Sequence, residues 1–217
     1  MTASPSSTRE CDVVIIGGAL AGSATAMQLL RAQPGLKIVI VEKTTAFPRK
    51  VGEATVEVSA YFLGRVLGLT QYLNEAHLVK QGMRFWFSNE RTTRLDQCSE
   101  IGGRYLARVA AYQVDRSTLD AEVLRRAAEL GAEIIRPANV QKVELVSGGT
   151  QTMLIRRGEQ SETIRARWIV DASGPAAFLA RQNGWWKPNL EHPTTSVWAR
   201  WRNVKDWDGH DLAQKFP

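Results

Sequence analysis

The stretch VVIIGGALAGSATA, residues 13–26, joins branched apolar residues to small residues through a pair of glycines. The apolar run Cys11 to Ile16 predicts a buried strand, and Ala, Met and Leu at helical spacing across Leu20 to Gln33 predict a helix. A second apolar run, Lys37 to Glu42, predicts another buried strand. A strand, a tight turn, a helix and a strand in this order indicate a right-handed βαβ unit.

The turn before the predicted helix carries a dinucleotide fingerprint, GxGxxG, with Ala19 at the middle glycine position. The first glycine permits the sharp bend, the middle position lets the backbone approach a pyrophosphate, and the last glycine lets helix and strand pack closely. The free N–H groups of the helix start attract phosphate. Glu42 follows Gly22 by twenty residues, where a carboxylate accepts hydrogen bonds from a ribose and repels a 2′-phosphate. We therefore expect NAD or FAD, bound by Gly17, Gly18, Ala19, Ala21, Gly22 and Glu42.

The chain after Glu42 favours FAD over NAD. An NAD dehydrogenase normally continues with further βαβ units, whereas here a charged loop, FPRKVGEAT, spans Phe47 to Thr55. A helical stretch interrupted by glycines, Val56 to Leu73, and an aromatic strand, Met83 to Ser88, come next.

A clear helix is predicted from Asp115 to Leu130, with Asp115 as the N-cap and Gly131 as the stop. Alternating segments then predict an antiparallel meander that ends in a buried strand. These segments are Asn139 to Val146, Thr152 to Arg156, Glu162 to Ala166 and, last, Trp168 to Val170.

Composition bounds the class of protein. The chain of 217 residues is long enough for one large domain or for one domain plus part of another, and its 44% hydrophobic content can support a core. The 28 Lys and Arg residues are scattered among 22 Asp and Glu, which argues against a nucleic-acid surface. Cys11 and Cys98 lack metal-ligand spacing, so we expect no metal site and a cytoplasmic protein. The apolar runs are too short for a membrane span, and His77, His192 and His210 are expected to be structural or surface residues.

These motifs together resemble the FAD-dependent monooxygenase superfamily of the p-hydroxybenzoate hydroxylase type, and within it the flavin-dependent tryptophan halogenase family. The resemblance rests on GGALAG, Glu42, the PRKVGEAT loop at Pro48 to Thr55, the helix that starts near Asp115, and WIVDASG at Trp168 to Gly174. It implies an α/β fold with a Rossmann-like FAD-binding parallel sheet flanked by helices, an antiparallel crossover meander and part of a second, substrate-domain sheet.

The domain organisation follows from the same resemblance. We expect a disordered N-terminus over residues 1–10 and an FAD-binding domain over 11–184 with a helical and strand insertion at 56–112. Residues 185–217 would begin a substrate domain. Members of the family are usually longer and carry a GD motif and a WxWxIP motif, and this sequence contains neither. The two tryptophans of Trp198-Ala199-Arg200-Trp201 are spaced differently from those of WxWxIP. We therefore expect the chain to be an N-terminal fragment.

The resemblance also assigns roles to residues around the cofactor. It puts Arg49 and the backbone of the GEAT loop along the flavin nucleotide, Arg116 near the ribityl or phosphate groups, and Asp171 in the DxxG stretch that closes over FAD. The implied contacts outside the fingerprint are Lys43, Arg49, Gly52, Glu53, Ala54, Arg116 and Asp171.

The implied reaction is oxygen activation at reduced FAD, followed in a halogenase by hypohalous acid that reaches a lysine beside the substrate. Lys80 is the candidate, because KQGMRF resembles the lysine-bearing stretch that follows the GEAT loop in tryptophan halogenases. A solvated Lys80 remains the alternative, and the aromatic residues at Phe85 to Phe87 are expected in a sheet core rather than beside a substrate.

Three functions stay open from the sequence. The first is a flavin-dependent halogenase acting on an electron-rich small molecule, and the second is a flavin-dependent hydroxylase. The third is a truncated, catalytically silent flavoprotein that acts through a partner. No second dinucleotide fingerprint is present, so a separate flavin reductase is an expected partner in the first case.

Overall fold

The computed structural model describes residues 7–88, 90–92, 94, 97–102 and 110–204. His210 and the last residues of the expected substrate domain lie outside these ranges. The chain divides into two compact units, Met1–Lys187 and Pro188–Pro217. The described part of the second unit, residues 188–204, contains neither helix nor strand.

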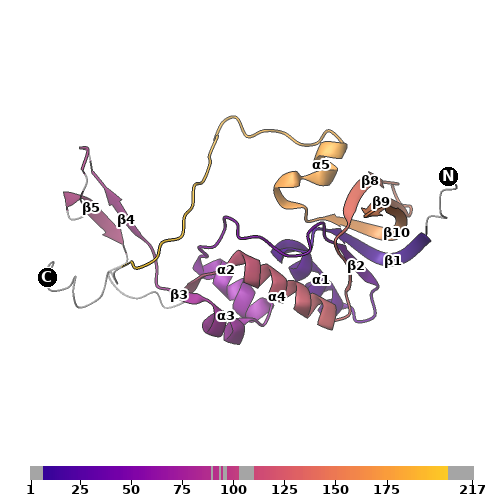
Figure 1. The fold of residues 1–217 in the computed structure, drawn as a ribbon, viewed down its shortest axis with the longest axis horizontal. Coiled ribbons are helices and arrows are strands. Elements are labelled where there is room, and N and C mark those ends of the chain that lie inside the picture. The colour runs from indigo at the N-terminus through magenta and orange to yellow at the C-terminus, as the bar shows by residue number, and fades with distance from the viewer. Residues whose placement is uncertain (1–6, 89, 93, 95–96, 103–109, 205–217) are drawn as a thin grey trace. The chain divides into compact units, whose positions relative to one another are not determined.

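The first unit is built around a six-stranded sheet with the order β7-β2-β1-β10-β9-β8 (Figure 1). Its strands are β1 (Ser7–Ile16), β2 (Ile38–Val41), β7 (Glu133–Ile135), β8 (Asn139–Glu144), β9 (Gln151–Arg157) and β10 (Gln160–Asp171). The pairs β1–β2, β2–β7 and β1–β10 are parallel, whereas β8–β9 and β9–β10 are antiparallel. The meander therefore extends the parallel sheet through β10.

Alternate residues of the central strands enter two hydrophobic cores because neighbouring side chains of a strand point to opposite faces. Ile15 and Ile40 pack with the helices α1 (Leu20–Ala32) and α4 (Arg116–Glu129) on one face. Val14 and Val39 belong to the second core, which includes Met153 of β9. Burial on both faces explains why these strands read as unbroken apolar runs.

Helix α4 forms as the sequence predicts. The Asp115 side chain accepts a hydrogen bond of 2.9 Å from the Ser117 N–H group and caps the helix. Gly131 follows the helix with φ of 108°, a left-handed conformation that glycine adopts without strain. Helices α1 and α4 lie side by side in Figure 1, and both contribute to the first core.

The helical stretch after the charged loop breaks near its glycines, as expected. It consists of α2 (Glu57–Tyr61), the π-helical η1 (Phe62–Val66) and α3 (Thr70–Ala76). Two short antiparallel pairs accompany it, β3 (Leu78–Lys80) with β6 (Ala111–Gln113) and β4 (Arg84–Phe87) with β5 (Ser99–Gly102).

The aromatic strand β4 does not enter a core. Phe85 is 52% exposed and Phe87 is 49% exposed, so the expectation that these rings pack inside a sheet is wrong. The physical reason is that β4, within the described part of the chain, pairs only with β5, and a two-stranded hairpin has no second layer of its own to bury a face.

Two boundaries differ from the sequence expectation. Strand β1 begins at Ser7, before the expected Cys11, because its first residues pair with β10 and Arg9 donates a hydrogen bond of 2.7 Å to Glu162. Strand β10 is continuous through the two segments we expected to be separate. Trp168 lies in its second half and is 68% exposed, so this part is not the buried strand that its apolar residues indicated.

The C-terminal part of the first unit holds the short 3-10 helix η3 (Gly174–Ala176) and the helix α5 (Phe178–Gln182). Across the described ranges, no helix combines the length and the apolar character that a membrane crossing needs.

Candidate functional site

The β1–α1 turn depends on glycine at two positions. Gly17 has φ of 98°, and a Cβ atom there would lie 2.5 Å from the carbonyl oxygen of Ala172. A Cβ atom at Gly22 would lie 1.9 Å from the carbonyl oxygen of Gly17. The turn and the start of α1 therefore pack closer than any residue with a Cβ atom permits, as the fingerprint predicts.

Helix α1 begins without a side-chain cap. Its N-cap is Ala19, which has extended backbone angles and no side-chain hydrogen-bonding group. The first N–H groups of a helix lack intrahelical partners, and their positive partial charge suits an anion. Ser23 does not serve as a cap, because its hydroxyl donates to the carbonyl oxygen of Gly18 at 2.6 Å.

Glu42 lies directly beside this turn, at the end of β2. Its carboxylate accepts hydrogen bonds of 2.8 Å from the Gly18 N–H group and from both the N–H and hydroxyl groups of Thr44. Burial favours a raised pKa, but these hydrogen bonds and the charge of Arg136 outweigh burial, so the pKa of Glu42 lies below its ordinary value. The structure thus supplies an ionised acceptor next to the glycine turn.

The GEAT loop is fixed to the β6–α4 connection by backbone hydrogen bonds. The Val114 N–H group donates to the Glu53 carbonyl at 2.8 Å, and the Thr55 N–H group donates to the Tyr112 carbonyl at 2.9 Å. The Arg116 N–H group also donates to the Glu53 carboxylate at 3.2 Å. These bonds hold the loop against the start of α4, although Glu53 and Arg116 are far apart in sequence.

Three cations around this loop are paired with acids. Arg116 contacts Asp120 with Nε at 3.0 Å and Nη2 at 3.2 Å, and Lys50 Nζ reaches the same carboxylate at 2.5 Å. Arg49 lies 3.5 Å from Asp115 and is largely exposed. Arg49 therefore remains accessible to a ligand, whereas Arg116 offers the side of its guanidinium group that faces away from Asp120.

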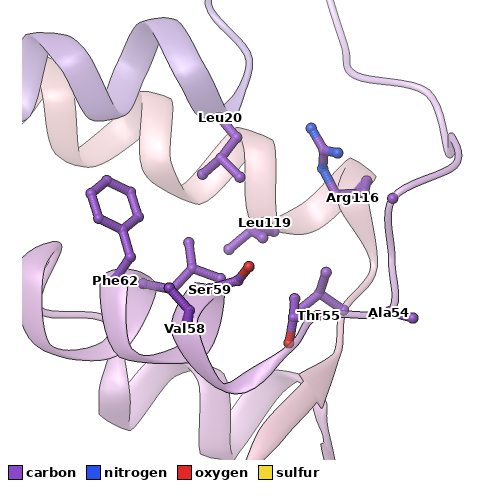
Figure 2. A pocket seen from close by; sticks show the side chains of 11 residues that line it. Leu20, Ala54, Thr55, Val58, Ser59, Phe62, Arg116 and Leu119 are labelled. Carbon is purple, nitrogen blue, oxygen red and sulfur yellow. The ribbon is translucent and has the colours of Figure 1, made fainter. Parts of the chain in front are cut away.

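A pocket of about 460 Å³ opens between α1, the α2–η1 segment and the start of α4. Figure 2 shows Leu20 from α1, Arg116 and Leu119 from α4, and Val58, Ser59 and Phe62 from the α2–η1 segment around it. The GEAT loop contributes Gly52, Ala54 and Thr55 to the wall. The pocket is mostly apolar with one guanidinium group, an arrangement typical of a small-molecule or cofactor site.

Asp171 has a structural task that its motif alone does not reveal. Its carboxylate accepts hydrogen bonds from the Ser173 N–H group at 3.0 Å and from the Leu179 N–H group at 2.7 Å. It thereby fixes the turn that leads from β10 to α5. Because Ile16 pairs with Asp171, this turn lies beside the glycine turn of β1.

Lys80 ends strand β3 and contacts the GEAT loop. Its ammonium group donates to the Thr55 carbonyl oxygen at 2.9 Å and is partly buried. Met83 and Phe85, which the sequence suggested as apolar neighbours, are about half exposed. Lys80 is absent from the residues lining the pocket, but Thr55, its hydrogen-bond partner, is one of them. Lys43 is exposed, next to Glu42.

Sequence reasoning missed the helical wall of the pocket and the Lys50–Asp120 pair. Val58 and Phe62 are apolar in the sequence, but their exposure, 79% and 40%, is known only from the structure. Lys50 stands next to Arg49 in the loop, and nothing local distinguishes which of the two cations turns inward. Groups of three or more His, Cys, Asp or Glu side chains able to hold a metal ion do not occur in the part of the chain that the structure describes.

His77 joins α3 to the N-terminus of α4. Its Nδ1 atom accepts a hydrogen bond of 3.2 Å from the Asp115 N–H group, and its ring lies edge-on to Tyr72 at 5.2 Å. Its Nε2 atom is buried and has no hydrogen-bond partner within the described residues. Burial lowers the pKa of His77 against the opposing charges of Asp115 and Glu53, so the folded protein favours the neutral ring.

Acidification is expected to destabilise the fold through His77. Its pKa lies below 6.5 in the folded protein, so the unfolded chain binds the proton first, and stability falls as pH drops from about 6.5 toward the folded pKa. Thermal melting between pH 5 and 8 measures this effect. His77→Phe, which keeps a ring beside Tyr72, should flatten the profile, and the exposed His192→Gln should not. Parallel profiles for all three proteins would contradict the prediction.

A family model described as Lycopene cyclase protein matches residues 12–187. The chain belongs to the lycopene cyclase protein family. The matched range includes the glycine turn, Glu42, the GEAT loop and the β10–α5 turn. Family membership does not by itself determine the reaction, because one fold supports several chemistries.

Two curated relatives of this family member are a chlorinase and a flavin-dependent halogenase by name. The 1H-pyrrole-2-carbonyl-[peptidyl-carrier protein] chlorinase of Pseudomonas fluorescens is 30% identical over 193 residues, which cover 82% of this chain and 42% of the relative. The flavin-dependent halogenase chlA of Dictyostelium discoideum is 28% identical, covering 89% of this chain and 37% of the relative. The chain thus spans less than half the length of these relatives.

Solved structures agree with the fold. The flavin-dependent brominase Bmp2 is 26% identical with a TM-score of 0.67, covering 80% of this chain and 40% of the brominase. The flavin-dependent halogenase CmlS is 25% identical with a TM-score of 0.68, covering 81% of this chain and 31% of that structure. The resemblance to flavin-dependent halogenases and the Rossmann-like α/β fold expected from the sequence are both confirmed.

Proposed function

We propose that this chain is the FAD-binding part of an FAD-dependent oxidoreductase of the flavin-dependent halogenase type. The observation that carries the proposal is the Glu42 carboxylate, hydrogen-bonded to the Gly18 N–H group, beside the uncapped start of α1. A carboxylate there suits the adenosine ribose and the helix start suits the pyrophosphate, which together fit an extended dinucleotide. The halogenase names of the relatives give the reaction class.

The remaining residues would hold FAD as follows. The backbone of Gly17 to Gly22 would bind the pyrophosphate, Lys43 would lie near the adenosine, and Arg49 would lie along the flavin nucleotide. The backbone of Gly52, Glu53 and Ala54 would also lie along the flavin nucleotide, and Arg116 of the mostly apolar pocket wall would supply a hydrogen-bond donor. Asp171 positions the turn beside Gly17. FAD, when bound, supplies the oxygen-activating redox chemistry.

Lys80 is the proposed catalytic residue for halogen transfer. Its ammonium group donates a hydrogen bond to the carbonyl oxygen of Thr55, a residue that lines the pocket. The other two N–H groups of the ammonium remain able to donate to further acceptors. A compact ammonium donor suits a lysine that holds hypohalous acid for delivery to an electron-rich small molecule. The reducing equivalents would come from a separate flavin reductase.

The proposal is tested first by the visible spectrum of the purified protein. We expect flavin absorption bands as isolated or after incubation with FAD and removal of the excess. A colourless protein that binds NAD in the same titration would overturn the assignment.

Glu42→Arg is expected to weaken FAD binding by about 1–3 kcal/mol. The change removes the ribose acceptor and also the partner of the Gly18 N–H group, and it leaves the ribose hydroxyls facing a cation. Fluorescence titration with FAD measures the dissociation constant. Glu159→Arg, the same charge change at an exposed turn, is the control and should bind FAD normally. Equal dissociation constants for both variants would show that Glu42 only organises the turn.

A flavin-dependent hydroxylase is the second candidate function. One observation favours it: Lys80 is engaged by the Thr55 carbonyl, as a purely structural lysine would be. Product analysis separates the two candidates, because a hydroxylase inserts oxygen and no halide. A silent flavoprotein that acts through a partner would bind FAD and yield neither product.

A further inference from the structure

The side chain of Asp120 is wholly buried in α4, yet it carries two ion pairs. Arg116, one helical turn earlier, and Lys50, in the charged loop, both contact its carboxylate. A buried carboxylate is stable in a protein when it is paired and hydrogen-bonded. Asp120 therefore binds together two segments that lie seventy residues apart in the sequence.

The two pairs have different consequences for the pocket. Arg116 uses Nε and Nη2 for Asp120, which leaves Nη1 directed to the loop, 2.9 Å from where a Cβ atom of Gly52 would lie. Lys50 holds the loop to the same carboxylate, and its ammonium group lies 5.6 Å from the centre of the buried Phe47 ring. Arg116 and Gly52 line the pocket, whereas Asp120 and Lys50 do not.

We propose that Asp120 is a positioning residue, which closes the Phe47–Thr55 loop onto α4 through Lys50 and fixes the guanidinium orientation of Arg116 in the pocket wall. The proposal rests on the proposed function for its ligand, FAD. Asp120 acts through its two partners and touches neither cofactor nor substrate. The bidentate contact with Asp120 restricts the Arg116 guanidinium group to one orientation, whereas an unpaired arginine side chain would rotate freely.

The direction of the effect on FAD affinity distinguishes positioning from simple electrostatics. Asp120→Asn removes a negative charge beside the pocket, so a purely electrostatic role predicts tighter binding of the anionic dinucleotide. A positioning role predicts weaker binding, because the loop and Arg116 lose their fixed arrangement. We expect the dissociation constant to rise roughly tenfold, which corresponds to the loss of one well-oriented charged contact.

The experiment compares Asp120→Asn, Lys50→Met and the control Glu122→Gln. Glu122 is on the same helix and also pairs with two arginines, but these are Arg125 and Arg126, remote from the loop. Hydrogen exchange of residues 47–55 is measured without FAD, and the FAD dissociation constant is measured by fluorescence. Both Asp120→Asn and Lys50→Met should speed exchange in the loop and weaken FAD binding, and Glu122→Gln should do neither.

The double variant Lys50→Met/Asp120→Asn measures whether the effects of Lys50 and Asp120 on FAD affinity depend on each other. Since Lys50 acts through Asp120, the double variant should bind FAD no more weakly than Asp120→Asn alone. Unchanged loop exchange in Lys50→Met, or tighter FAD binding in Asp120→Asn, would overturn the proposal. If Asp120→Asn does not fold, Lys50→Met alone tests the positioning role, because methionine keeps an apolar side chain near Phe47. Wild-type protein that binds no FAD would defeat the proposed function, while the exchange of the loop still decides the positioning role.

Discussion

Gly22→Ala is expected to lower the melting temperature by roughly 10 °C and to abolish FAD binding. The added Cβ atom would lie 1.9 Å from the Gly17 carbonyl oxygen, which is a backbone atom and cannot rotate away. Either α1 moves away from β1 or the turn changes its path. Substitutions that overpack a tightly packed site lower the free energy of unfolding by up to about 3 kcal/mol, which is a large share of the stability of a single domain.

Gly148→Ala is the matched control for Gly22→Ala. Gly148 has φ of 68° in the turn between β8 and β9, and no atom lies within 4 Å of a Cβ atom built there. The substitution therefore adds only backbone strain of about 1 kcal/mol. Calorimetry and flavin retention on gel filtration should separate the two variants. Similar melting temperatures would show that the β1–α1 turn yields more readily than its packing indicates.

Local patterns in the sequence predicted the parts of the fold that local chemistry decides. The glycine turn, the helix capped by Asp115 and stopped by Gly131, and the first two strands of the meander form where the pattern places them. Helix capping and strand alternation depend on neighbours within a few residues, so periodicity and capping rules suffice for them. The fingerprint also predicted correctly that Gly22 must lack a side chain.

The features that the sequence did not reveal depend on distant partners. Strand β1 reaches Ser7 because Arg9 pairs with Glu162, far along the chain. Phe85 is exposed because β4 belongs to a two-stranded sheet, and the aromatic residues of β4 do not indicate how many strands pair with it. Lys50 turns inward because Asp120 is buried there, and a helix pattern alone does not show which acid of α4 faces the loop.

Lys80→Met is expected to eliminate halogenated product while FAD remains bound. Methionine keeps the length and the apolar stem of the side chain but removes the ammonium donor, so hypohalous acid would lose its partner. Loss of the hydrogen bond to the Thr55 carbonyl should cost only about 1 kcal/mol of stability. The assay is mass spectrometry of products from a panel of electron-rich arenes with chloride or bromide and a flavin reductase.

Lys80→Arg distinguishes a catalytic lysine from one that merely holds the loop. Arginine also donates to a carbonyl oxygen, so a structural role predicts that Lys80→Arg restores product and FAD affinity together. A catalytic role predicts that product stays absent, because the planar guanidinium group does not present the compact charge of an ammonium group. Lys142→Met, an exposed cation paired with Glu144, should leave product unchanged. Halogenated product in Lys80→Met would remove Lys80 from the mechanism, and hydroxylated product without halide in the wild type would favour the hydroxylase instead.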